Sequence, residues 1–175
     1  MGIFQNELDV ATIDLEDRFK LEIGHYFTAT QYSCVCLDTF TNGLLSYQLS
    51  NILPKMSYLG CLSSSSSDII KTFTGITAPI STSASSSFSL ETAKSMAKKF
   101  NSQVCISLSG ISSIPDSKNI ITSKVFIAYM FNNNVSEKCV ECFGTQSEVI
   151  RQTLHACLGY LKLLFIKYPI KKKEN

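Results

Sequence analysis

The sequence lacks a strong excess of charge of either sign. Its 16 Lys and Arg residues nearly balance its 14 Asp and Glu residues, which leaves a formal net charge of +2. Much of that excess comes from the three lysines at 171–173, which are typical of a solvated tail. The charge balance therefore gives no indication of a nucleic-acid-binding surface.

The sequence also lacks a recognisable leader or membrane segment. The first residues turn acidic instead of basic and apolar, and Asn6 stands where a myristoylation motif needs Ser or Thr. The longest apolar run, 158–166, is interrupted by Lys162 and is too short to span a bilayer. We therefore expect no signal peptide and no membrane partner.

Charged residues are few, at 17%, whereas hydrophobic residues reach 45%. This balance is typical of a globular chain, and 175 residues can bury a core without disulfides or a structural metal. We predict a lead-in at 1–12, one domain at 13–170 and a basic tail at 171–175.

Seven cysteines, an odd number without a leader, indicate free thiols in a reducing compartment, so we expect a cytoplasmic protein. Cys139 and Cys142 have CxxC spacing, and Cys34 and Cys36 offer a second pair for zinc. Both pairs lie in β-prone stretches without the turn that closes a zinc loop, and on a strand Cys139 and Cys142 point to opposite faces. We favour buried free cysteines and assign no metal ligands.

Histidine is nearly absent as well, with two residues in the chain. His25 falls away from the apolar stripe of a predicted helix, and His155 falls beside the core face of another. Both are typical of ordinary helix positions, so neither points to a catalytic base or a metal ligand.

Hydrophobic periodicity orders the first half of the chain. Leu15, Phe19, Ile23 and Phe27 recur every four residues and predict a helix. Ser89 is a suitable N-cap for a later helix, after a Ser/Thr-rich loop. The predicted elements are a helix at 14–29, a strand at 33–37, a helix at 44–52, a strand at 58–62, a short helix at 68–73, a loop at 74–88 and a helix from 89.

The second half is richer in strands. Stretches 104–108, 124–131 and 136–143 have β character, and the three asparagines at 132–134 predict a hairpin turn. Thr145 and Glu148 form a capping box before a long final helix. Helices separated by strands and ending in one hairpin predict an α/β fold: a three-layer α/β/α sandwich with a mixed sheet of about five strands.

The turn at 38–43, Asp-Thr-Phe-Thr-Asn-Gly, is similar to the Glu-Ser-Cys-Thr-Gly-Gly turn of the CinA C-terminal domain family. Thr39 stands where that family has its nucleophilic serine. The element order agrees over 15–168. Further similarities are Phe88-Ser89 through Met96-Ala97, the stretch at 107–115 ending in Pro115, Ser123-Lys124-Val125, and Arg151 in the final helix.

This resemblance implies an anticodon-binding-domain-like fold and hydrolysis of the carboxamide of nicotinamide mononucleotide. In the family a serine nucleophile and a lysine base carry the reaction, no cofactor is needed, and homodimers are common. A small phosphorylated ligand of this kind is the expected partner. Its implied contacts here are Thr41, Asn42, Gly43, Gly110 and Arg151.

The catalytic pair that the resemblance implies is Thr39 and Lys71. A threonine hydroxyl can act as a nucleophile, although its methyl group crowds a serine site. The other interpretation, which we favour, is that Thr39 or Thr41 caps a helix and that Lys71 is a solvated helix residue.

Two segments depart from the family pattern. Ser112-Ser113-Ile114-Pro115-Asp116 replaces a Gly-rich loop, and Thr145-Gln146-Ser147 replaces Gly-Asp-Arg. Together with the changed nucleophile, these departures indicate a catalytically impaired relative that keeps the fold and a nucleotide pocket. The alternatives are an active, divergent amidohydrolase using Thr39 and Lys71, and, less favoured, a zinc or redox protein built on the CxxC cysteines.

Overall fold

The computed structural model describes residues 17–77 and 84–169. The predicted lead-in at 1–12 and the tail at 171–175 lie outside these residues. The elements, in chain order, are α2 (Asp17–Thr30), β1 (Cys34–Asp38), α3 (Leu44–Ile52), β2 (Tyr58–Ser63), α4 (Ser67–Thr74), α5 (Ser86–Phe100), β3 (Val104–Ser112), β4 (Ile121–Phe131), β5 (Asn134–Gly144) and α6 (Gln146–Lys167).

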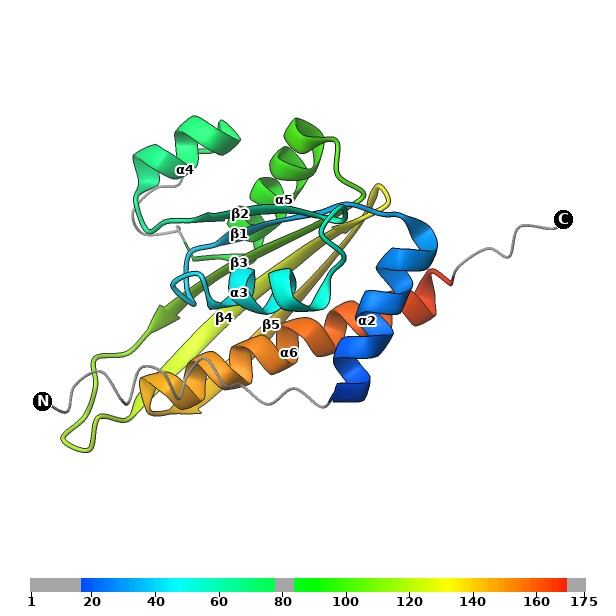
Figure 1. Cartoon of the computed structure of the whole chain (residues 1–175). Coiled ribbons are helices and arrows are strands. Elements are labelled where there is room, and N and C mark those ends of the chain that lie inside the picture. Colours follow the sequence, from blue (N-terminus) through cyan, green and yellow to red (C-terminus); the bar gives the residue numbers. More distant parts are fainter. Residues whose placement is uncertain (1–16, 78–83, 170–175) are drawn as a thin grey trace, which may run out of the picture.

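The strands form one mixed five-stranded sheet in the order β2-β1-β3-β4-β5. β2, β1 and β3 run parallel, whereas β4 and β5 are antiparallel to their neighbours. Helices α4 and α5 cover one face, and α2, α3 and α6 cover the other (Figure 1). The predicted α/β class and mixed sheet are confirmed.

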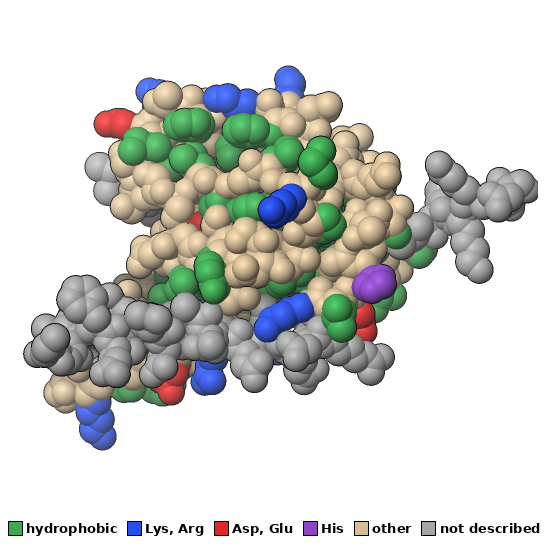
Figure 2. All heavy atoms as spheres, in the orientation of Figure 1, with side chains coloured by type: hydrophobic (Ala, Val, Ile, Leu, Met, Phe, Trp, Pro, Cys, Tyr) green, Lys and Arg blue, Asp and Glu red, His purple; other side chains and the backbone are tan. Residues whose placement is uncertain are grey.

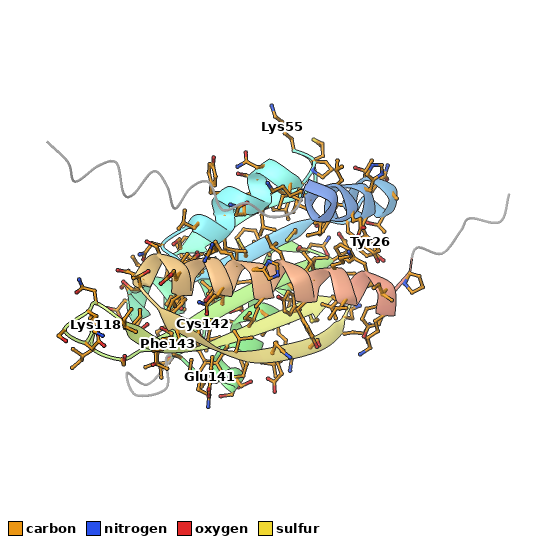
Figure 3. The ribbon with its side chains drawn as sticks, turned by 90° about the horizontal axis from the view of Figure 1, so that it is seen from below. Tyr26, Lys55, Lys118, Glu141, Cys142 and Phe143 are labelled. Carbon is orange, nitrogen blue, oxygen red and sulfur yellow. The ribbon has the colours of Figure 1, made fainter. Side chains whose placement is uncertain are left out.

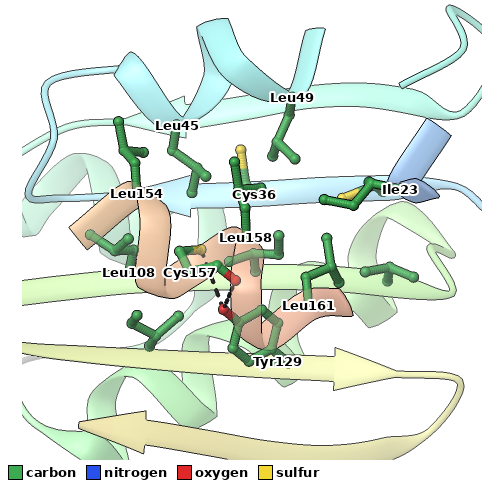
Figure 4. Close-up of a cluster of buried hydrophobic side chains, with 14 of the residues drawn as sticks. Ile23, Cys36, Leu45, Leu49, Leu108, Tyr129, Leu154, Cys157, Leu158 and Leu161 are labelled. Carbon is green, nitrogen blue, oxygen red and sulfur yellow. Dashed lines mark hydrogen bonds between the residues drawn. The ribbon is translucent and has the colours of Figure 1, made fainter. Parts of the chain in front are cut away.

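The larger part of the core lies between the sheet and α2, α3 and α6 (Figure 4). β1 is buried along its whole length because helices cover both of its faces, which explains its continuous apolar sequence. At the centre, the hydroxyl of Tyr129 donates to the carbonyl oxygen of Cys157 at 2.6 Å. Burial raises the pKa of the Tyr129 hydroxyl well above its usual value, so the group stays neutral. Val125, Ile127, Tyr129 and Phe131 alternate along β4, and all four are buried in this core.

The opposite face has a thinner core. Val35 and Cys105 meet Ala93, Met96 and Ala97 of α5. Figure 2 shows apolar side chains gathered over α4 and the neighbouring edge strand β2, where Ile69, Phe73 and Leu59 are exposed.

The final helix begins as predicted. The Thr145 hydroxyl accepts from the Glu148 N–H, and the Glu148 carboxylate accepts from the Thr145 N–H, which completes the capping box. α6 is, among the described residues, the one helix long and apolar enough to cross a membrane, but half of that apolar window is buried inside the protein. Its apolar residues serve the core beneath β4 and β5.

The two boundaries around the predicted loop at 74–88 differ from the sequence prediction. Ser89 is not an N-cap: α5 starts at Ser86, and the Ser85 hydroxyl accepts from the Phe88 N–H. The neighbouring serines could cap a helix equally well. The start at Ser86 is the one that places Phe88 inside the helix, where its side chain is buried. The loop predicted at 74–88 is therefore too long at both ends, because Thr74 still belongs to α4 and Ser86 already belongs to α5. Residues 78–83 lie outside the described part.

The β-strands of the second half are longer than predicted. β3 continues to Ser112 and β4 begins at Ile121 because their antiparallel ladder extends past the covered part of the sheet. The asparagine turn is confirmed: Asn132 and Asn133 both have positive φ, as a two-residue hairpin turn requires. The first helix is described from Asp17, and Ile23 and Phe27 are buried as predicted.

Candidate functional site

The three parallel strands end at one edge of the sheet, and the chain leaves them in opposite directions. From β1 it passes through α3 to β2 on one side, and from β2 it returns through α4 and α5 to β3 on the other side. In open α/β sheets, ligands bind in the crevice where such connections diverge. That position here lies between the ends of β1 and β3.

The turn that leaves β1 is organised by the carboxylate of Asp38, which is 1% exposed. One carboxylate oxygen accepts from the N–H groups of Phe40 at 3.0 Å and Thr41 at 2.7 Å. The other accepts from the N–H of Gly43 at 3.0 Å and from the Thr41 hydroxyl. The turn's own N–H groups are thus directed inward at a side chain of the same turn.

The two threonines of this turn have different roles. The Thr41 hydroxyl accepts from the N–H of Leu45 at 3.1 Å, so it caps the start of α3, in agreement with the capping interpretation. The Thr39 hydroxyl donates to the carbonyl oxygen of Leu108 on β3 at 3.1 Å, and the Thr39 N–H donates to the same atom. Thr39 therefore ties the turn to the neighbouring strand.

Asn42 and Gly43 both adopt left-handed backbone conformations, with φ of 54° and 89°. Asparagine tolerates this region and glycine adopts it freely, so these residues fit the local backbone without a ligand. Asn42 is exposed and Gly43 is half-buried.

Gly110 lies beneath the ring of Phe40. A Cβ atom built at Gly110 would lie 2.5 Å from a ring carbon, so the glycine permits the ring to pack onto β3. Phe40 in turn packs against the large core. The ring therefore fills the crevice between the ends of β1 and β3.

An open pocket of about 480 Å³ adjoins the outer side of Phe40. It is bounded by the β3–β4 loop and by the beginning of α6, which lie close together in Figure 3, where Lys118 marks the loop. None of its lining residues carries a charge. They are Phe40, Ser112, Ser113, Pro115, Asn119, Ile121, Thr145, Gln146, Ser147, Val149 and Ile150.

The start of α6 contributes backbone donors to this pocket. The N–H groups of Gln146 and Ser147, in the first turn, have no partner within the helix. Hydrogen bonds from the Thr145 N–H and hydroxyl lower the pKa of Glu148, which keeps this carboxylate ionised at the capping box. The two segments in which the sequence departs from the CinA pattern, 112–116 and 145–147, thus meet in one pocket.

Lys71 and Arg151 lie away from it. Lys71 is exposed on α4, the helix that packs against α5, and Arg151 is exposed on α6 beside Glu148. Neither side chain lines the pocket. The structure thus brings Phe40, Gly110 and the two divergent segments together, whereas the Thr39 hydroxyl faces the Leu108 carbonyl.

The cysteine pairs considered for zinc lie on different strands. Cys34 and Cys36 belong to β1 and Cys139 and Cys142 to β5, with β3 and β4 between them. Cys139 is exposed and Cys142 is buried, which confirms the predicted opposite orientations. Within 17–77 and 84–169 no group of three or more His, Cys, Asp or Glu side chains is arranged to hold a metal.

Three residues of the site, Asp38, Phe40 and Asn119, were missed by sequence reasoning. Asp38 had a usable signal, since Asp side chains often accept from backbone N–H groups two residues on in a turn, and Asn42-Gly43 marks a turn here. Phe40 had none, because its role depends on Gly110, which is distant in sequence. Asn119 was likewise unmarked by any motif, whereas Gln146 lies in the segment 145–147 that departs from the family pattern.

Sequence comparison with protein-family models found no match, and comparison with curated proteins found none. Solved structures do match. A CinA superfamily protein from Klebsiella pneumoniae 700603 is 12% identical, with a TM-score of 0.72, covering 86% of this chain and 97% of that one. A competence or damage-inducible protein from Enterobacter asburiae is 17% identical, with a TM-score of 0.70 and coverages of 89% and 97%.

A CinA superfamily protein from Escherichia coli is 14% identical, with a TM-score of 0.70, covering 93% of this chain and 99% of that one. At such low identity the likeness concerns the fold. This chain has the fold of the CinA superfamily proteins over nearly their whole length. The resemblance inferred from the order of elements is thereby confirmed at the level of fold.

Gly110→Ala should destabilise the protein by about 1–3 kcal/mol, because the new methyl group displaces the Phe40 ring. In a Phe40→Ala background the same change should cost less than about 0.5 kcal/mol, since the clash is gone. Urea unfolding of the two single variants and the double variant measures this coupling. An equal cost of Gly110→Ala in both backgrounds contradicts the contact.

Proposed function

We propose that this protein is a catalytically impaired, CinA-fold relative of the nicotinamide mononucleotide amidohydrolases that binds a small phosphorylated ligand beside Phe40. One observation carries the proposal: the Asp38 carboxylate already accepts the N–H groups of Phe40, Thr41 and Gly43. The loss of chemistry and the retention of a pocket have separate support.

Amide hydrolysis requires an activated hydroxyl, and the hydroxyl of Thr39 lacks an activating base. Its proton is directed at the Leu108 carbonyl oxygen, which is a hydrogen-bond acceptor but does not take up a proton at neutral pH. The only lysine suggested by the resemblance, Lys71, is exposed on α4. A catalytic lysine is held desolvated beside the hydroxyl that it activates, and an exposed side chain is not.

Amide hydrolysis also requires donors for the oxyanion. A turn before a helix is a suitable place for them, but donors aimed at an internal carboxylate are not available to a substrate. The acceptor oxygens of Asp38 therefore occupy the place that a substrate oxyanion would need. This arrangement opposes stabilisation of the tetrahedral intermediate.

The pocket beside Phe40 supports ligand binding. Its volume of about 480 Å³ lies within the range of small-molecule sites, and it combines an aromatic wall with serine hydroxyls and an amide. The N–H groups at the start of the 22-residue helix α6 can donate to an anionic group such as phosphate, an attraction that the ionised Glu148 carboxylate in the same turn reduces. In this pocket, the aromatic ring of a nucleotide ligand would pack against Phe40, and its phosphate would lie at the N–H groups of Gln146 and Ser147.

One observation favours the alternative, an active amidohydrolase that uses Thr39 and Lys71. The Ser64 N–H donates to the carbonyl oxygen of Asp38 at 3.3 Å, so the loop that leads into α4 lies against the Asp38 turn. Lys71 therefore belongs to a helix that starts near Thr39. In an active amidohydrolase, α4 would have to move on substrate binding so that Lys71 reaches the Thr39 hydroxyl.

Seven free cysteines favour a reducing compartment, and we propose a cytoplasmic location on that ground. A homodimer remains an expectation from the family resemblance.

The catalytic prediction is that purified protein releases no ammonia from nicotinamide mononucleotide above the level of a Thr39→Ala variant. Circular dichroism establishes that both samples are folded, and an active CinA-type amidohydrolase serves as the positive control. Turnover that disappears in Thr39→Ala or Lys71→Ala contradicts the proposal and establishes the divergent enzyme.

The binding prediction uses two serines at equivalent helix positions. Ser147→Asp places a negative charge in the first turn of α6 and should weaken binding of nicotinamide mononucleotide by about tenfold or more, because it repels the phosphate. Ser87→Asp adds the same charge to the first turn of α5, outside the pocket, and should leave binding unchanged. Isothermal titration calorimetry measures both; equal affinities, or no binding by the unmodified protein, contradict the assigned pocket.

A further inference from the structure

Two cysteines stand opposite each other on the outermost pair of parallel strands. We propose that Cys36 and Cys61 form a reversible disulfide bond when the protein meets a low-molecular-weight disulfide such as oxidised glutathione, which makes this pair a redox modification site. It is separate from the ligand pocket beside Phe40 and does not depend on the proposed function.

The sheet register places the two residues together. Cys36 of β1 pairs directly with Cys61 of β2, and directly paired residues point to the same face of a sheet. Both side chains pack against the large core beneath α3. Neighbouring strands lie about 4.8 Å apart, which falls within the Cα separation of disulfide-bonded cysteines.

None of the other five cysteines is directly paired with a cysteine in the described ladders, although all seven lie in described residues. In the described ladders Cys34 pairs with Tyr58 and Val104. Cys105 pairs with Val35 and Met130, Cys139 pairs with Phe126, and Cys142 pairs with Ser123. Cys157 lies in α6 and not on a strand.

β2 can supply the small movement that a disulfide needs. Disulfide-bonded Cβ atoms lie about 3.8 Å apart, closer than ordinary neighbours on adjacent strands. β2 is the edge strand and is held by one neighbour, and its register with β1 shifts beside Leu59. Gly60 follows, with φ of 128° and open space around it. Residual strain makes such a bond easy to reduce again.

The exposure of the two thiols sets the order of reaction. Cys61 is half-buried, whereas Cys36 is fully buried. The Cys61 thiolate attacks one sulfur of oxidised glutathione and releases one glutathione. The Cys36 thiolate then attacks the Cys61 sulfur and releases the second, so the two protein thiols lose two electrons and two protons and glutathione disulfide gains them. Burial, and next the neighbouring Cys61, raise the pKa of the Cys36 thiol, so the second step quickens as the pH rises.

The bond would form next to the elements that lead into the turn. The Tyr58 hydroxyl lies 3.5 Å from the Cys36 sulfur and 2.7 Å from the Ser46 hydroxyl of α3. Cys36 is also two residues before Asp38 on the same strand. Oxidation thus joins β1 to β2 beneath α3.

The test uses a Cys139→Ser background, which removes the exposed thiol. This variant is incubated in its folded state with oxidised glutathione, its free thiols are blocked with N-ethylmaleimide, and it is digested with trypsin without reductant. Cleavage after Lys55 places Cys36 and Cys61 on different peptides, and fragment ions in the mass spectrum distinguish Cys36 from Cys34. We expect a Cys36–Cys61 crosslinked peptide that forms faster at pH 9 than at pH 7 and disappears with dithiothreitol. Adding Cys61→Ser or Cys36→Ser should abolish it.

Three results overturn the proposal. They are a stable glutathione adduct on Cys61 without a crosslink, crosslinks that involve other cysteines to the same extent, and no oxidation at all. Circular dichroism before and after incubation shows whether the protein remains folded, so that a crosslink formed in unfolded chains counts against the site.

Discussion

A buried carboxylate, that of Asp38, holds together the turn between β1 and α3. It is 1% exposed, and a polar group at that depth is stable only because N–H groups and a hydroxyl surround it. The same bonds fix the start of α3, the left-handed conformation of Gly43 and the orientation of Phe40. Each of these features follows from the hydrogen bonds of one buried side chain.

Phe40 extends that order to the second strand. Its ring occupies the space that Gly110 leaves on β3, so the crevice at the end of the parallel strands is closed by a side chain and the open pocket lies outside it. In this arrangement the polar groups of the turn serve the fold, while the free N–H groups lie at the start of α6. The Asp38 turn and the first turn of α6 are thus different parts of the candidate site.

Much of the fold could be read from the sequence because its signals are local. The period of Ile23 and Phe27, the alternation in β4, the asparagine turn and the Thr145–Glu148 box each specify their own element. The start of α5 could not be read, because several adjacent serines cap equally well and the burial of Phe88 decides among them. The ends of β3 and β4 depend on pairing between strands, which the sequence of neither strand reveals.

The candidate site was predicted in part. The turn at 38–43 and the divergent segments at 112–116 and 145–147 were marked by their differences from a family pattern, and the last two line one pocket with Phe40. The inward use of the turn's N–H groups could not be foreseen, because it depends on the direction of the Asp38 side chain. The packing of Phe40 on Gly110 joins residues 70 positions apart and leaves no local signal.

The most direct measurement of the account is the unfolding of an Asp38→Asn variant, with amide hydrogen exchange at Phe40, Thr41 and Gly43. Replacing the carboxylate by an amide weakens several charge-assisted hydrogen bonds and should lower the free energy of unfolding by about 1.5–3 kcal/mol, with faster exchange at those three amides. Glu91→Gln, at an exposed position on α5, should change stability by less than about 0.5 kcal/mol. Unchanged stability and unchanged protection in Asp38→Asn would show that the turn does not depend on this carboxylate.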